Sequence, residues 1–123
     1  PFDRILADVP CSASGVTRRH PDIKWTRQPA DVAKFAIQQA LMIDALWRLL
    51  APGGKFLYAT CSVFEEENHL QIASFLARHS EARVEPLPHA APGAQAPFSR
   101  ECPGQILPDA EHDGFFYALL RKA

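Results

Sequence analysis

The chain has 123 residues, of which 47% are hydrophobic and 22% are charged, and its formal net charge at pH 7 is −1. This composition is ordinary for a globular domain, so a fully disordered or fibrous chain is excluded. Because 13 Lys and Arg balance 14 Asp and Glu, the overall charge does not attract nucleic acid, and any such surface has to be local. At this length we expect one domain with a buried core.

The chain start and the cysteines indicate a reducing environment. The apolar stretches are far shorter than the roughly 20 residues that span a bilayer, and no basic and apolar leader precedes the first strand-like run. Three cysteines, an odd number, predict free thiols rather than a disulfide framework. The sequence opens directly on an apolar run without Met, so we expect a segment of a longer protein.

The first half predicts a strand, a long loop, a helix and a second strand. Apolar residues 4–9 predict a buried strand that ends before Pro10. Residues 11–28 predict a loop, and residues 31–50 an amphipathic helix that ends at the turn 51–54. Residues 55–60 predict the second strand. The stripe that we expect to face the core consists of Val32, Phe35, Met42, Leu46 and Leu49.

The second half predicts a further helix and two strands. Ser62 and Glu65 fit a capping box for a helix over residues 64–79. Residues 83–87 and 114–120 predict strands, joined by a Pro- and Gly-rich loop over 88–108. The residues of the second helix that we expect inward are Leu70, Ala73, Leu76 and Ala77. Alternation of strands and helices predicts an α/β fold with a mostly parallel sheet, and the last strand is expected to return antiparallel.

Two Cys-Ser pairs follow predicted strands, and ligands of such sheets lie beyond the carboxyl ends of the strands. If the first two strands are neighbours, Cys11 and Cys61 face one cleft. A buried inert thiol is the common role of a single cysteine. A redox pair lacks a Cys-x-x-Cys motif, and a zinc site would need ligands such as His20, His69 or Cys102, which have no recognised spacing.

A nucleophilic thiol is the remaining interpretation of this pair. Cys61 would precede the second helix, whose dipole favours a thiolate, although the acidic run 65–67 opposes it. We interpret that run as an ordinary acidic first helical turn. These interpretations stay open on the residues alone.

The loop over residues 17–27 is locally basic. Its cations could contact phosphates beside the strand ends, or could simply be solvated, with Trp25 anchoring the loop on the core. The candidates for contact with RNA are Arg18, Arg19, Lys24 and Arg27.

Five stretches carry a resemblance to a known family. They are residues 8–15 (DVPCSASG), 18–25 (RRHPDIKW), 53–62 (GGKFLYATCS), 66–68 (EEN) and 113–118 (DGFFYA). Through them the chain closely resembles the C-terminal half of the catalytic domain of Sun-type, or Fmu-type, RNA cytosine-5 methyltransferases, and among these the bacterial enzymes that act on 16S ribosomal RNA. The resemblance covers nearly the whole chain except the loop near residues 88–100.

This resemblance implies a partial Rossmann-like fold of the S-adenosylmethionine-dependent methyltransferases. Residues 1–123 would be the C-terminal portion of the catalytic domain, with strands four to seven, and would lack the N-terminal half that builds most of the cofactor site. The implied protein is a cytoplasmic enzyme that modifies ribosomal RNA. A non-enzymatic RNA-binding module and a thiol redox protein are the alternatives.

The resemblance also implies residue roles. Cys61 would add to carbon 6 of cytosine, which makes carbon 5 nucleophilic toward a methyl group. Cys11 would serve either the removal of the proton from carbon 5 or the release of the product, and Asp8 would hydrogen-bond the target base or the amino group of the methyl donor. No metal is implied. Without strand one, the strand over residues 4–9 would be an unpaired edge, so we expect self-association of the chain.

Overall fold

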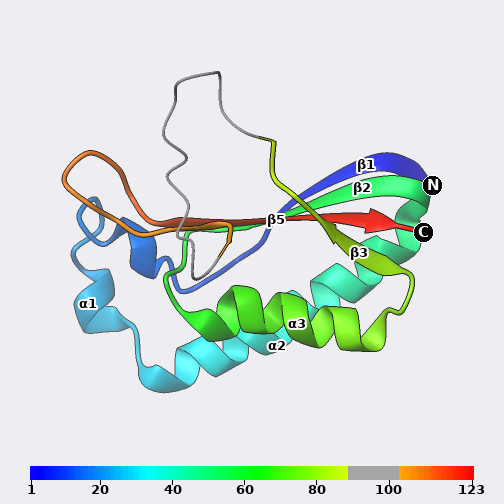
Figure 1. The fold of residues 1–123 in the computed structure, drawn as a ribbon. Helices are drawn as coiled ribbons and strands as arrows, with labels where there is room; N and C mark the ends of the chain where they lie inside the picture. The colour runs from blue at the N-terminus through cyan, green and yellow to red at the C-terminus, as the bar shows by residue number, and fades with distance from the viewer. Residues whose placement is uncertain (89–102) are drawn as a thin grey trace.

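The computed structural model describes residues 1–88 and 103–123, which form a mixed sheet with two helices against one of its faces (Figure 1). The elements in chain order are β1 (Phe2–Asp8), η1 (Ser14–Val16), α1 (Ile23–Thr26), α2 (Pro29–Leu49), β2 (Leu50–Thr60), η2 (Glu65–Glu67), α3 (His69–Arg78), β3 (Ala82–Glu85), β4 (Gln105–Ile106) and β5 (Phe115–Lys122). Among them, α2 and α3 are the helices that cover the sheet.

The strand order confirms the predicted α/β class and the reversed last strand. The sheet runs β1-β2-β5-β3, with β4 paired to β5 off this path. β1 and β2 are parallel, whereas β5 is antiparallel to both β2 and β3. The crossover from β1 to β2 passes through α2, as expected for a parallel pair. The carboxyl ends of β1 and β2 therefore meet at one end of the molecule, beside α1.

Some predicted boundaries are wrong. α2 begins at Pro29 because the carboxylate of Asp31 accepts the N–H of Gln28 at 2.8 Å and closes the first turn. β2 begins at Leu50, so residues 51–54 belong to the strand rather than to a separate turn. The loop over 11–28 contains η1 and α1, and β4 lies within the predicted loop over 88–108.

The second helix also differs from its prediction. Ser62 does not cap an α-helix; η2 follows it, and α3 begins only at His69. Asn68 interrupts the helix with φ −114° and ψ −112°. Its buried amide donates to the carbonyl of Ser62 at 2.8 Å and accepts the hydroxyl of Thr60 at 2.6 Å. These bonds to the end of β2 replace the helical geometry there.

The core lies between the sheet and the two helices. The α2 side chains that are fully enclosed are Gln39, Ile43 and Trp47, about one position away from the predicted stripe, and Leu49 is exposed. Trp47 packs edge-on against Phe75 of α3, with ring centroids 5.0 Å apart. α3 also departs from its predicted inward face, since it buries Gln71, Ile72 and Phe75 while Leu70 is 47% exposed. The apolar pattern alone missed both amides and the tryptophan.

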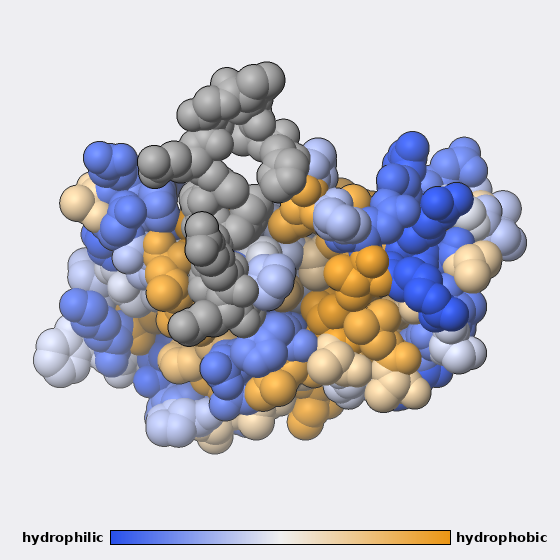
Figure 2. Space-filling view, in the orientation of Figure 1, coloured by the Kyte–Doolittle hydropathy of each residue, from blue (hydrophilic) through white to orange (hydrophobic). Residues whose placement is uncertain are grey.

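Part of the apolar surface is uncovered. β1 pairs only with β2 among the described residues, which confirms that it is an edge strand. Phe2 and Leu6 on β1 and Ile37 and Leu41 on α2 are each at least 60% exposed. Figure 2 shows hydrophobic side chains at the surface between two hydrophilic ends. Within the described ranges, neither helix is long and apolar enough to span a membrane.

Two isoleucines on α2 test the register of this helix. Ile43→Ala is expected to lower the free energy of unfolding by about 2–5 kcal/mol, because Ile43 is fully buried and its truncation leaves a cavity. Ile37→Ala is the matched control, and we expect a change below about 0.5 kcal/mol because Ile37 is 65% exposed. Urea denaturation followed by circular dichroism measures both. Equal losses would mean that α2 does not present Ile43 to the core.

Candidate active site

The two predicted strand-end cysteines lie in contact. The Sγ atoms of Cys11 and Cys61 are 3.4 Å apart, although 50 positions separate the residues in the sequence. The contact follows from the parallel pairing of β1 with β2, in which Asp8 lies opposite Ala59. Both cysteines are free thiols and partly buried. The expectation that the two thiols come together beyond the strand ends is therefore confirmed.

The contact changes the acidity of the thiol pair. The hydrogen bond between the two side chains lowers the pKa of Cys11 to about 7, against an opposing effect of burial. The same hydrogen bond raises the pKa of Cys61, and burial and the charges of Cys11 and Asp8 raise it further. The contact thus favours a thiolate on Cys11 and a protonated Cys61.

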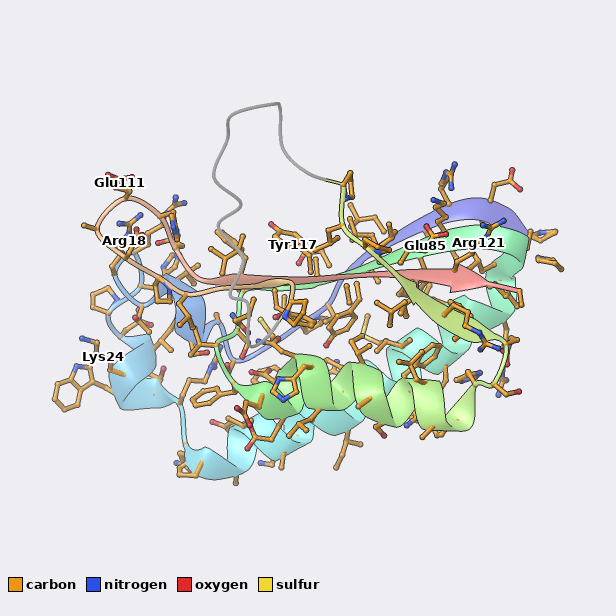
Figure 3. The ribbon with its side chains drawn as sticks, in the orientation of Figure 1. Arg18, Lys24, Glu85, Glu111, Tyr117 and Arg121 are labelled. Carbon is orange, nitrogen blue, oxygen red and sulfur yellow. The ribbon has the colours of Figure 1, made fainter. Side chains whose placement is uncertain are left out.

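A cavity of about 430 Å³ opens beside Cys61. It lies on the face of the sheet away from α2 and α3, where Tyr117 of β5 also projects (Figure 3). Asp8, at the end of β1, lines this cavity with Cys61, as does Arg19 from the loop after η1. A thiol, a carboxylate and a guanidinium thus border one space of a size suited to a small ring.

A buried carboxylate joins the two Cys-Ser segments. Glu67 of η2 is fully enclosed, and its Oε2 accepts the hydroxyl groups of Ser12, at 2.6 Å, and of Ser62. Its Oε1 accepts the backbone N–H of Ser12 at 2.8 Å and the amide of Gln39 at 3.1 Å. The interpretation of residues 65–67 as an ordinary acidic first turn is wrong for Glu67. The sequence alone does not distinguish the buried Glu67 from its neighbours Glu65 and Glu66, because all three are glutamates.

Gly15 packs the loop after Cys11 against the ends of β2 and β5. Its N–H donates to the carbonyl of Cys61 and its carbonyl accepts the N–H of Gly114, both at 2.8 Å. A Cβ atom at this position would lie 2.3 Å from the carbonyl oxygen of Gly114 and 2.7 Å from that of Cys61. Only glycine fits this close approach of three backbone segments.

Two of the predicted RNA-binding cations are engaged within the protein. The Nε atoms of Arg18 and Arg19 lie 2.8 and 2.7 Å from the carboxylate of Asp113, whose side chain is 1% exposed. The pairs hold the basic loop against the turn that enters β5, a role for Asp113 that sequence reasoning missed. The side chain of Arg19 remains 68% exposed, so it still presents charge at the cavity of Cys61.

The other two predicted cations lie around a second cavity, of about 470 Å³, between α1 and the start of α2. Lys24 is exposed there, at the same end of the molecule as Arg18 (Figure 3). Arg27 donates to the carbonyl of Ser12 at 2.9 Å and lies over the ring of Phe35. Trp25 is 88% exposed, so the expectation that it anchors the loop on the core is wrong, whereas Ile23 of the same loop is buried.

The zinc interpretation finds no support in the described residues, where no three His, Cys, Asp or Glu side chains gather in a way that could hold a metal ion. Cys102, which the sequence offered as one ligand, lies outside the described residues.

Comparisons with known proteins identify the family. The model of the 16S rRNA methyltransferase RsmB/F family matches residues 1–121. The chain belongs to this family. It is 51% identical to ribosomal RNA small subunit methyltransferase B of Pasteurella multocida over 122 residues, which are 98% of this chain and 26% of that protein. The chain thus spans about a quarter of the length of the curated relatives that it matches.

Solved structures agree with this assignment. A methyltransferase homolog from Pyrococcus horikoshii is 32% identical, with a TM-score of 0.74 over 99% of this chain and 39% of that one. NSun6 from Pyrococcus horikoshii, determined with SFG, is 28% identical, with a TM-score of 0.71 over 95% of this chain and 29% of that one. The RsmB/F segment therefore has the partial Rossmann-like methyltransferase fold implied by the resemblance.

Replacement of Gly15 tests the packing at the strand ends. Gly15→Ala is expected to lower the free energy of unfolding by about 1–3 kcal/mol, because the added methyl group overlaps two backbone carbonyls. Gly53→Ala is the control: its Cβ would meet nothing within 4 Å, so only its φ of +78° opposes the change, at a cost of about 1 kcal/mol. Thermal unfolding compares them. A Gly15 variant as stable as the wild-type chain would contradict the described packing.

Proposed function

We propose that this chain is the C-terminal portion of the catalytic domain of an RNA cytosine-5 methyltransferase that acts on 16S ribosomal RNA in the cytoplasm. The observation that carries the proposal is the 3.4 Å contact between Cys11 and Cys61, beside a cavity that Cys61 shares with Asp8. A module that only binds RNA has no use for two thiols in contact at the end of two strands. Membership of the RsmB/F family supports the enzymatic interpretation.

The chemistry of cytosine explains the need for a thiol. Carbon 5 of cytosine is too weak a nucleophile to take a methyl group, whereas addition of the Cys61 thiolate to carbon 6 makes carbon 5 resemble an enamine. After methyl transfer, the proton on carbon 5 leaves and the bond between the sulfur of Cys61 and carbon 6 breaks. We assign this second stage to Cys11, which lies within contact distance of the same sulfur.

S-adenosylmethionine would supply the electrophilic methyl group when bound. The residues of this chain fit the edge of such a site, since the carboxylate of Asp8 lines the cavity of Cys61 and can accept from an amino group of the donor or of the base. We propose that the rest of the methyl-donor site lies outside this chain.

The RNA would approach the end of the molecule at which β1 and β2 terminate. Arg19 borders the cavity of Cys61, and Lys24 and Arg27 border the neighbouring cavity, so their charges flank the route to the thiols. Arg18 contributes by holding the loop on Asp113 as well as by its own charge. This arrangement supplies the local positive surface that the net charge of −1 does not.

Cysteine variants of the full-length enzyme test the assigned roles. Cys61→Ala is expected to abolish the covalent complex with RNA that contains 5-fluorocytosine, because carbon 6 then has no sulfur partner. Cys11→Ala is expected to leave enzyme attached to ordinary RNA after methylation, because the second stage is blocked. Denaturing gel electrophoresis and mass spectrometry detect both complexes. A complex formed by the Cys61 variant but not by the Cys11 variant would exchange the two roles.

The uncovered edge of β1 leads to a second prediction. We expect this chain in isolation to self-associate through that edge and the adjoining apolar side chains, since an unpaired strand offers backbone donors and acceptors to another copy. Light scattering at several concentrations measures the mass. Leu6→Lys should shift the chain toward monomer, whereas Val84→Lys, on the opposite edge strand, should not. A chain that is monomeric at all concentrations would contradict this expectation.

A further inference from the structure

Glu67 is a buried carboxylate that the reaction described above does not use. It is fully enclosed, and the four groups that donate to it are neutral: two serine hydroxyls, one backbone N–H and the amide of Gln39. A buried carboxylate is costly unless such bonds satisfy it. Four donors from three separate segments are more than a helical turn of this length needs for its own geometry.

Glu67 is bonded to the two serines that directly follow the cysteines in the sequence. Ser12 follows Cys11 and Ser62 follows Cys61, and both hydroxyls donate to the same oxygen of Glu67. Both cysteines lie beyond the paired residues of β1 and β2, of which the last are Asp8 and Ala59. The sheet therefore does not fix their separation directly, whereas Glu67 bonds both segments just after the thiols.

The two nearby carboxylates affect the pKa values of different thiols. The carboxylate of Glu67 opposes the lowering of the Cys11 pKa, and that of Asp8 contributes to raising the Cys61 pKa. Tyr58 of β2 also faces this cluster, since its hydroxyl donates to the backbone carbonyl of Glu67 at 2.6 Å.

The cationic and remaining acidic groups lie on the loop and turn that pack against the thiol segments. Arg27 donates to the carbonyl of Ser12. Arg19 and Asp113 line the cavity on the side of Cys61. Of these charged side chains, Glu67 is thus the one that is hydrogen-bonded to both Cys-Ser segments.

We propose that Glu67 is a positioning residue for the two-cysteine reaction: its carboxylate holds the Cys11–Ser12 and Cys61–Ser62 segments together, so that Cys11 is in place when Cys61 has to leave the methylated base. The inference rests on the proposed function and deepens it by assigning a role to a residue that need not touch the RNA. Its charge also disfavours a thiolate on Cys11, so it favours transfer of the shared proton from Cys61 to Cys11 as Cys61 attacks the base.

The test compares Glu67→Gln with Glu66→Gln. The two glutamates are adjacent, but Glu66 is exposed and Glu67 is buried, so Glu66→Gln controls for the loss of one negative charge. In this chain with Cys102→Ser, the rates at which iodoacetamide alkylates Cys11 and Cys61 are followed by mass spectrometry against pH. For Glu67→Gln we expect the pH at which the alkylation rate of Cys11 is half-maximal, its midpoint, to fall by roughly half a pH unit or more. We expect no such shift for Glu66→Gln.

The full-length enzyme supplies the second measurement. Glu67→Gln is expected to lower kcat between about tenfold and a hundredfold with little change in the KM for RNA, and to accumulate the covalent complex on ordinary cytosine, as Cys11→Ala does. Ser62→Ala removes one of the four bonds but keeps the charge, so it should lower kcat less and leave the Cys11 midpoint unshifted. If Glu67→Gln does not fold, an unchanged kcat for both Ser12→Ala and Ser62→Ala overturns the proposal.

The two proposals fail in different ways. A folded Glu67→Gln chain with the wild-type alkylation profile, together with an enzyme of wild-type kcat, overturns the positioning role while Cys61 can still be the nucleophile. A covalent RNA complex that survives Cys61→Ala overturns the proposed roles, whatever the alkylation profile shows.

Discussion

The parallel pairing of β1 with β2 is the constraint on which the candidate site depends. Parallel strands place their carboxyl ends at the same edge, and the register that sets Asp8 opposite Ala59 brings Cys11 and Cys61 close together just beyond the ladder. A shift by one residue would turn the side chains of β1 to the other face and carry Asp8 away from the cavity. The long crossover through α2 makes this pairing possible between segments that are far apart in the sequence.

Beyond the last paired residues of β1 and β2, hydrogen bonds of polar groups hold the two segments together. The buried Glu67 and Asn68 hold the segment after β2, and Gly15 joins the loop after Cys11 to Cys61 through its N–H. Asp113 fixes the basic loop from the other side through its two arginine partners. Such a network is stable when its members are satisfied, and it then allows little freedom in the separation of the two thiols.

The sequence predicted the architecture better than the details of the site. Alternating apolar runs and turn residues identified the strands and the reversed return of β5, and the positions of Cys11 and Cys61 after two strands identified the cleft. Periodicity placed the inward face of α2 about one position away from the face that the structure buries. It considers only apolar residues, whereas one of the buried residues, Gln39, is an amide. It could not indicate that Glu67 and Asp113 are buried, since Ser12, a partner of Glu67, is 55 positions away and Arg18, a partner of Asp113, is 95 positions away.

The shared proton links this geometry to the order of events. In the resting pair the hydrogen bond between the sulfur atoms stabilises a thiolate on Cys11, whereas the proposed attack on cytosine would need the charge on Cys61. The proton has to pass across the 3.4 Å contact before or during the attack. Asp8 disfavours a charged Cys61 sulfur beside the cavity, and formation of the bond to carbon 6 removes that charge. The proposed mechanism therefore couples substrate binding to proton transfer, because without a base in the cavity the proton is more stable on Cys61 than on Cys11.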